Sequence, residues 1–229
     1  MEKYKPRVVS YDIECTGLKA DFSFLLCAAF HEVGTKKVKL ISVSQFAKDG
    51  RNPLLYEKQL VKAVAAEFAK ADLLIGYYTT GFDLPYLNAK MLEYGLPALP
   101  PIPQVDLFYT AKSKLAVSRR SLQNVAYYIR AENSKTPVEG RLWKAAQLGS
   151  KKSLRQIEKH NIADVLVLSE VYEKLRPLVR THPRVNGYGP CRYCGSDKLQ
   201  RRGLAVTKLR GEQQRLHCQN CGGWDLRAA

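Results

Sequence analysis

A chain of 229 residues is long enough for one well-packed domain and a small module, but not for two large domains. Its formal net charge of +16, from 37 Lys and Arg against 21 Asp and Glu, favours polyanionic partners, with nucleic acid ahead of an anionic membrane surface. Its longest apolar stretch, residues 22–30, is broken by a serine and is shorter than the roughly 20 residues of a membrane span.

The N-terminal part of the chain is rich in strand-like segments. Residues 1–7 carry no apolar core and no small-residue cleavage site, so we expect no signal peptide and an intracellular protein in a reducing compartment. Apolar and β-branched runs predict an antiparallel meander, after which strand-like and helical patterns alternate, as in a mixed α/β domain. The expected strands are 8–14, 22–30, 37–43 and 72–77, with a short strand or helix start at 105–107; the expected helices are 53–69, 84–94, 121–129 and 153–175, and 131–150 is expected to be a polar loop.

The composition of the chain changes after Leu178. Residues 181–190 contain two prolines and two glycines, which indicates a linker. Residues 178–229 hold ten basic and three acidic side chains, a net charge of +7. We therefore predict an α/β domain over residues 1–178, a linker over 179–190 and a small basic module over 191–229.

Four acidic residues are candidates for metal binding. Asp12 and Glu14 share one face of the first strand, where two carboxylates need a counter-charge that a hard cation such as Mg²⁺ or Mn²⁺ supplies. Asp83 follows a strand and opens a helix, where it also suits an N-cap. His160 and Asp164 are four residues apart on the long helix, which fits either a shared site or a surface pair.

In this order and spacing, the motifs resemble the DEDD superfamily of 3′→5′ exonucleases, whose fold is an RNase H-like mixed sheet flanked by helices. The residues that carry the resemblance are Asp-Ile-Glu at 12–14, Phe-Asp-Leu-Pro-Tyr-Leu at 82–87, and His160 with Asp164, within residues 7–176. The segment around Asp83 is most similar to proofreading exonuclease domains of family B DNA polymerases and their stand-alone relatives. Residues 105–107 and the helix start at Ser121 resemble the connecting region of those domains.

The resemblance implies that the four carboxylates bind two Mg²⁺ or Mn²⁺ ions, with Asp12 bridging them, Glu14 and Asp164 on the first and Asp83 near the second. Two ions roughly 4 Å apart activate the attacking water and stabilise the leaving 3′-oxygen. It also implies a 3′→5′ exonuclease, which we expect to act on single-stranded or frayed DNA, with a replication or repair protein in trans as a candidate partner.

Two residues depart from the family pattern. One branch of the superfamily has Tyr four positions before the last Asp and the other has His five positions before it, whereas His160 takes the spacing of the Tyr. We expect the neutral imidazole of His160 to orient or deprotonate the water. Tyr78 stands where many relatives carry Asn, and an aromatic ring there would suit stacking on a base.

Two Cys-x-x-Cys pairs, each followed by a glycine, lie near the C-terminus. In a reducing compartment such pairs indicate metal rather than disulfides, and four thiolates close a tetrahedral site for one structural Zn²⁺. The strand-like segments between the pairs predict a zinc ribbon, whose small core would depend on the metal. His217 is expected to be a strand residue, and Cys15 and Cys27 inert buried thiols. The predicted zinc ligands are Cys191, Cys194, Cys218 and Cys221.

Basic side chains of the module are expected to bind nucleic-acid phosphates, although a protein-docking module is the alternative. The residues predicted to bind nucleic acid are Arg192, Arg201, Arg202, Lys208 and Arg210.

Three other functions stay open. One is a ribonuclease or an endonuclease with the same metal site, and another is a catalytically degenerate nucleic-acid-binding protein. The third is a transposase-like strand-transfer enzyme, which also carries a carboxylate triad but normally ends it with Glu.

Overall fold

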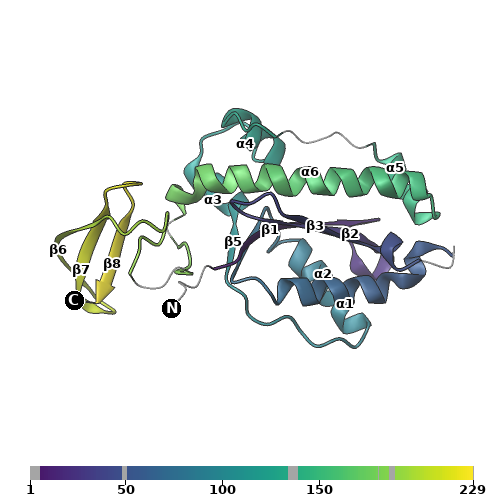
Figure 1. Cartoon of the computed structure of the whole chain (residues 1–229), viewed down its shortest axis with the longest axis horizontal. Helices are drawn as coiled ribbons and strands as arrows, with labels where there is room; N and C mark the ends of the chain where they lie inside the picture. The colour runs from purple at the N-terminus through teal and green to yellow at the C-terminus, as the bar shows by residue number, and fades with distance from the viewer. Residues whose placement is uncertain (1–5, 48–50, 134–138, 180, 186–188, 229) are drawn as a thin grey trace.

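The computed structural model describes residues 6–47, 51–133, 139–179, 181–185 and 189–228. It has two parts: a larger one built on a five-stranded sheet with helices on both faces, and a three-stranded sheet formed by the C-terminal residues (Figure 1). No helix in the described ranges combines the length and the apolarity needed to cross a bilayer.

The five-stranded sheet has the order β3-β2-β1-β4-β5. β2 pairs antiparallel with both β1 and β3, which confirms the predicted meander, whereas β1, β4 and β5 run parallel. The carboxyl ends of the three parallel strands therefore meet at one edge of the sheet, the edge at which open α/β sheets bind their ligands. The strands are β1 (Val8–Cys15), β2 (Leu25–Glu32), β3 (Val38–Ser42), β4 (Leu73–Gly76) and β5 (Gln104–Asp106).

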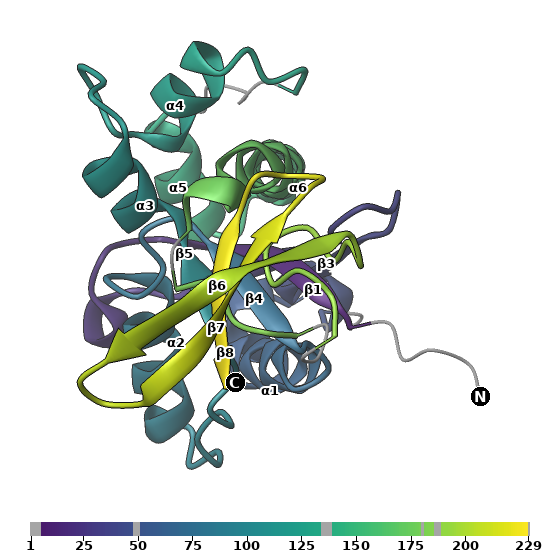
Figure 2. The same cartoon turned by 90° about the vertical axis from the view of Figure 1, so that its left-hand side faces the viewer.

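Helices cover the two faces of this sheet (Figures 1 and 2). α1 (Glu57–Phe68) and α2 (Asp83–Glu93) lie on one face, and α3 (Leu107–Lys114), α4 (Leu122–Tyr128) and α6 (Lys151–Leu175) lie on the other. Phe68 of α1 packs edge-on against Tyr11 and Phe30 of the sheet, with ring centroids 4.6 and 5.5 Å away. The alternating side chains of β1 place Val9, Tyr11 and Ile13 in the apolar core, whereas Ser10 and Asp12 contact α6.

The long helix α6 carries the residues that join the second layer to the sheet. Ser150 caps its N-terminus by accepting a hydrogen bond from the Ser153 amide. Its predicted apolar stripe is buried along the sheet, and Asn161 and Asp164 are buried on the same side of the helix. The Ser10 hydroxyl of β1 donates a hydrogen bond to the Val165 carbonyl of α6 at 2.9 Å and so fixes the position at which the helix crosses the strand. The buried stripe consists of Leu154, Ile157, Val165, Leu168, Tyr172 and Leu175.

The predictions of a loop over 131–150 and of a strand beginning at Phe22 were wrong. The first region contains α5 (Arg141–Gln147), a seven-residue helix too short to show apolar periodicity, which packs against α6 through tertiary contacts; residues 134–138 lie outside the described part. At the second, residues Ala20–Phe22 form a 3₁₀ turn (η1) with Phe22 85% exposed, and the strand begins at Leu25. The other short 3₁₀ helices are η2 (Val43–Gln45), η3 (Pro53–Tyr56) and η4 (Arg176–Leu178).

The C-terminal residues form a three-stranded antiparallel sheet in the order β6-β7-β8. Its strands are β6 (Leu199–Thr207), β7 (Gly211–Cys218) and β8 (Trp224–Ala228). The small core of this sheet contains Cys191, Tyr193 and Cys218, so the cysteines take the place that apolar residues occupy in a larger domain.

Candidate active site and cysteine site

The structure brings all five predicted catalytic residues to one cavity of about 560 Å³ at the carboxyl edge of the parallel strands. Asp12 and Glu14 come from the end of β1, Asp83 from the first residue of α2, and His160 and Asp164 from α6. The negative charges of Asp83, Glu14 and Asp12 add to the effect of burial in raising the pKa of the Cys15 thiol. The carboxylates are therefore close enough to form a common region of negative potential.

Asn161 holds Asp12 in place, and this role was not foreseen from the sequence. Its side-chain amide donates to Asp12 Oδ2 at 2.7 Å and to the Asp12 carbonyl at 3.2 Å. Asn161 is completely buried, next to His160 in the chain and three residues before Asp164. The sequence did contain a signal for this contact: Asn161 interrupts the apolar stripe of the helix, and a buried polar side chain needs a hydrogen-bond partner.

Asp83 is buried, with 5% of its surface exposed. It does not serve as the expected N-cap, because Phe82 occupies that position and Asp83 is the first helical residue. Its Oδ1 instead accepts a hydrogen bond from the Ile13 amide at 3.3 Å, which ties α2 to β1 between Asp12 and Glu14. Burial raises the pKa of Asp83 to about 7, against the lowering effect of its backbone hydrogen bonds. A nearby cation would offset the desolvation of this carboxylate.

His160 stands between two of the carboxylates. Its Nε2 lies 3.7 Å from Glu14 Oε1 and 3.7 Å from Asp164 Oδ2. The indole of Trp143, on α5, meets the imidazole edge-on at 6.4 Å and 88°. The unpredicted helix α5 thus contributes one wall of the cavity and restricts the orientation of His160.

The loop between β4 and α2 is fixed by Asp106 at the end of β5. Asp106 Oδ1 accepts from the Tyr78 amide at 2.8 Å, and Oδ2 accepts from the Thr80 amide and hydroxyl at 3.1 and 2.6 Å. Tyr78 has φ +63°, a left-handed conformation that Asn adopts more readily than Tyr. Its ring lies so close to Gly81 that a Cβ there would sit 2.6 Å from it. The half-exposed Tyr78 ring is consequently held at the rim of the cavity.

The donor set of this cavity fits hard divalent cations. Four carboxylates line it, and among the described residues the only side chains of the lining that can carry a positive charge are Lys19 and His160. Oxygen ligands of this kind are those that Mg²⁺ and Mn²⁺ prefer. The carboxylates are spread more widely than the ligands of a single closed metal site. Within the described ranges, only the four cysteines form a set of three or more Cys, His, Asp or Glu ligands whose atoms all lie within 4.8 Å of one another.

The four cysteines have the geometry of a zinc site. The Sγ atoms of Cys191 and Cys221, and those of Cys194 and Cys218, are 3.7 Å apart. A disulfide needs about 2.05 Å, whereas sulfurs at about 2.3 Å from zinc in a tetrahedron lie roughly 3.8 Å from each other. Gly195 adopts φ +72° and donates its amide to the Cys191 carbonyl at 2.9 Å, which closes the first knuckle. This set fits Zn²⁺, and His217 is not part of it.

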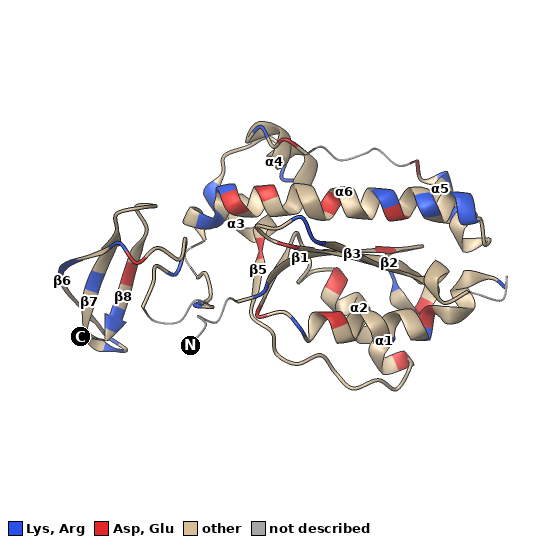
Figure 3. Cartoon of the chain, in the orientation of Figure 1, with Lys and Arg blue, Asp and Glu red and all other residues tan. Residues whose placement is uncertain are grey.

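The residues predicted to bind nucleic acid fall into three groups. Arg201 and Arg202 are exposed on β6, and Lys208 and Arg210 are exposed at the β6–β7 turn. Arg192, in contrast, donates its Nε and Nη2 to the His182 carbonyl at 3.0 and 2.7 Å. Lys and Arg lie on the strands of this C-terminal sheet and also on the larger part, among other places at both ends of α6 (Figure 3).

Comparisons with known proteins place the fold of the chain in a family. No curated protein matches it in sequence. Among solved structures, it is similar to the family B DNA polymerase from the hyperthermophilic archaeon Pyrobaculum calidifontis, with a TM-score of 0.53 and 15% identity, over 90% of this chain and 31% of the polymerase. The chain therefore spans about a third of that protein, and the likeness is one of fold. A family model described as the RNase H superfamily matches residues 9–176, which confirms the predicted RNase H-like fold. This chain belongs to the RNase H superfamily.

Proposed function

We propose that this protein is a metal-dependent nuclease that removes nucleotides from the 3′ end of single-stranded or frayed DNA. The observation that carries the proposal is the convergence of Asp12, Glu14, Asp83 and Asp164 on one cavity at the carboxyl edge of the sheet. Membership of the RNase H superfamily supports a nuclease, and the similar structure, a DNA polymerase, favours DNA. An intracellular location and a replication or repair partner in trans stay predictions from the sequence.

The side chains of the cavity have separate tasks in this proposal. Mg²⁺ or Mn²⁺ ions held by the four carboxylates would supply activation of the attacking water and stabilisation of the leaving 3′-oxygen. Asn161 keeps the Asp12 carboxylate in one orientation, and the Ile13 amide does the same for Asp83. His160, within 3.7 Å of both Glu14 and Asp164, is positioned to orient the water and accept its proton.

A degradation assay tests this proposal. End-labelled single-stranded DNA, duplex DNA and single-stranded RNA are incubated with Mg²⁺ or Mn²⁺, and the product ladder is read over time. We expect a single-stranded DNA with a 5′ label to shorten one nucleotide at a time. Asp164→Asn abolishes the ladder, whereas Glu173→Gln, an exposed acidic position on the same helix, leaves it unchanged.

The other functions give different ladders. Internal fragments at early times would identify an endonuclease, and cleavage of RNA alone would identify a ribonuclease. An unaltered rate in Asp12→Asn and Asp164→Asn proteins would overturn the assignment of the metal site, and absence of any cleavage by the wild type would favour a degenerate binding protein.

The proposal includes one structural Zn²⁺ bound by the four cysteines. All four positions of a tetrahedral site are then filled by protein sulfur, so this ion has no open position for a substrate or a catalytic water. Its contribution is to hold the two knuckles and the three-stranded sheet together.

A further inference from the structure

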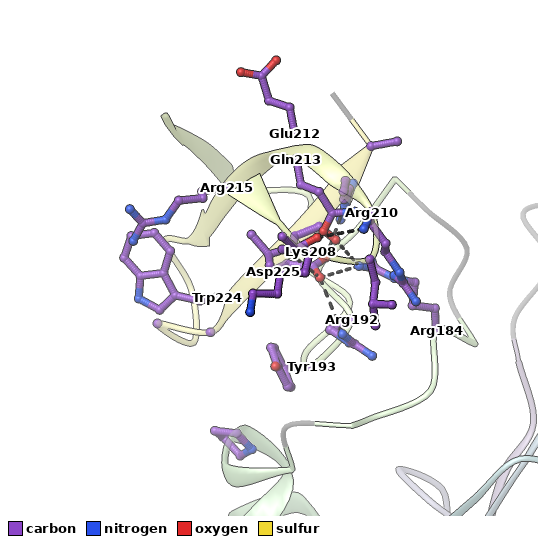
Figure 4. Close-up of a pocket in the computed structure, with 18 residues that line it drawn as sticks. Arg184, Arg192, Tyr193, Lys208, Arg210, Glu212, Gln213, Arg215, Trp224 and Asp225 are labelled. Atoms are coloured by element: carbon purple, nitrogen blue, oxygen red, sulfur yellow. Dashed lines mark hydrogen bonds and ion pairs between the residues drawn. The ribbon is translucent and has the colours of Figure 1, made fainter. Parts of the chain in front are cut away.

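The C-terminal sheet carries a groove that the proposed hydrolysis does not use (Figure 4). We call it the ribbon groove; it lies along β7, β8 and the β6–β7 turn, and Arg184 and Arg192 of the preceding segment form its other side. Its volume of about 1680 Å³ exceeds the roughly 300–1,000 Å³ of small-molecule sites. A groove of this size and openness suits an extended ligand.

The charge of the ribbon groove is positive. Its lining contains six basic and two acidic side chains. One of the acidic residues, Asp225, is shared by three arginines: it pairs with Arg184, with Arg227 at 3.2 Å and with Arg192 at 3.7 Å. Within the described residues, Lys208, Arg210 and Arg215 form no ion pair with a carboxylate, and all three are exposed. The groove therefore offers cationic groups to a polyanion.

An aromatic surface lies beside these charges. Trp224 is 47% exposed, and its ring lies 4.6 Å from that of His217, its partner across β7 and β8. The Arg215 guanidinium lies over the same indole at 4.9 Å, as Figure 4 shows. Residues directly opposite on antiparallel strands share a face, so the His217 imidazole, the Trp224 indole and the Arg215 guanidinium gather on one face of the sheet, with the two rings tilted by 31°. Half-exposed indole beside a guanidinium is a surface on which nucleobases stack.

We infer that the ribbon groove binds single-stranded nucleic acid, with a base stacked on the Trp224–Arg215 surface and phosphates at Lys208 and Arg210. A duplex keeps its bases stacked on one another and leaves no base face for the indole, so a single strand is the better fit. Binding by the groove deepens the proposed function, because it adds a second contact for the strand whose end enters the active site. Binding of nucleic acid to the ribbon groove can nevertheless be measured without any hydrolysis.

The two tryptophans of the chain report on the two sites separately, because Trp143 lines the active-site cavity and Trp224 the ribbon groove. In the Trp143→Phe protein, titration of 15-nucleotide dT or U oligonucleotides without added Mg²⁺ or Mn²⁺ should quench the remaining fluorescence saturably. The dT and U arms distinguish DNA from RNA. A 15-base-pair duplex should bind more weakly than either.

Substitutions separate stacking from charge. With a fluorescently end-labelled oligonucleotide as the probe, since these variants lack the Trp224 signal, Trp224→Ala should weaken binding of the single strand roughly 5- to 150-fold, and Trp224→Phe, which keeps an aromatic ring, should recover most of it. Lys208→Gln, which leaves the Trp224–Arg215 surface intact, should reduce the slope of log affinity against log salt by about 0.7, the value for one phosphate contact on a single strand. Lys62→Gln, an exposed position on α1, removes the same charge and should leave the slope unchanged.

The inference is overturned if Trp224 fluorescence does not respond, if Trp224→Ala binds as tightly as the wild type, or if duplex binds more tightly than single strands. Equal weakening by Trp224→Ala and Trp224→Phe, or loss of bound zinc in both, would also overturn it in favour of a structural role. Failure of the binding tests leaves the nuclease proposal intact, because that proposal is tested by the loss of the degradation ladder in the Asp164→Asn protein. Conversely, Asp164→Asn should still bind the oligonucleotide if the groove acts independently.

Discussion

The imidazole of His182 stacks on the phenol ring of Tyr172, with 5.9 Å between the ring centroids. Its Nε2 accepts a hydrogen bond from the Tyr172 hydroxyl at 2.7 Å. His182 Nδ1 donates to the Pro183 carbonyl at 2.8 Å, which fixes the tautomer that can accept. The His182 carbonyl in turn accepts from Arg192, next to the first zinc-ligand candidate. The last turns of α6 are thus joined to the C-terminal module through a segment that the sequence predicts as a linker.

This buried histidine should make stability depend on pH. Burial lowers the pKa of His182 to about 4, and the charges of Arg176 and Arg192 act in the same direction. The unfolded chain binds a proton at about 6.5, so between these values the unfolded state holds more protons and stability falls as pH falls. The free energy of unfolding begins to fall below about pH 6.5 and stops falling near pH 4, and the total decrease is at most roughly 3 kcal/mol.

Denaturant unfolding at several pH values measures this effect. His182→Gln removes the titration, so the difference in unfolding free energy between wild type and variant should shrink as the pH falls from 7.5 to 4.5. Proton-linked loss of zinc affects both proteins and cancels in the comparison. A difference that does not change with pH would contradict the assignment.

Asn161 is expected to act on catalysis through Asp12. Because its amide orients the Asp12 carboxylate, Asn161→Ala should lower metal affinity and activity by roughly 10- to 100-fold with the fold retained. The Mn²⁺ concentration that gives half-maximal rate reports the effect on metal binding, which a purely structural loss would not move. Gln156→Ala, at an exposed position of the same helix, is the control and should leave both values unchanged. Equal effects in the two variants would argue against a positioning role.

Much of the fold follows from local pattern. The meander, helices α1, α2 and α6 and the buried stripe of α6 depend on periodicities of two and 3.6 residues, which the sequence displays directly. Helix α5 does not, because seven residues give too few apolar positions to define a period, and its stability comes from contact with α6.

The candidate site divides in the same way. The sequence predicts that Asp12, Glu14, Asp83, His160 and Asp164 belong to one site, because their motifs are local, and the structure places all five at one cavity. The roles of Asn161 and Asp106 were not, because each acts on a residue far away in the chain: Asn161 on Asp12, and Asp106 on Tyr78 and Thr80. Contacts of this kind exist only once the sheet has brought the segments together.

The loop before Asp83 should be sensitive to any side chain at Gly81. A Cβ at this position would lie 2.6 Å from the Tyr78 ring, so either the ring or the loop must shift. Gly81→Ala should therefore reduce stability by about 1–3 kcal/mol and reduce nuclease activity, because Asp83 is two residues away. Gly140→Ala, with nothing within 4 Å and no positive φ, is the matched control. Thermal unfolding and the degradation assay measure both effects, and a neutral Gly81→Ala would show that the Tyr78 ring is free to move.

Removal of one cysteine tests whether metal holds the C-terminal sheet. Plasma emission spectrometry should find one zinc per wild-type chain and none in Cys218→Ser, because three thiolates do not close the tetrahedral site. Without the ion, the small core of Cys191, Tyr193 and Cys218 is too limited to keep the sheet folded, so trypsin should cut within β6 and β7 while the RNase H-like domain resists. Cys27→Ser changes a buried thiol of β2 and should retain the zinc and the protected sheet. A wild-type chain that contains no zinc yet keeps this sheet resistant to trypsin would mean that the knuckles fold without metal, and that the cysteine packing itself supplies the stability.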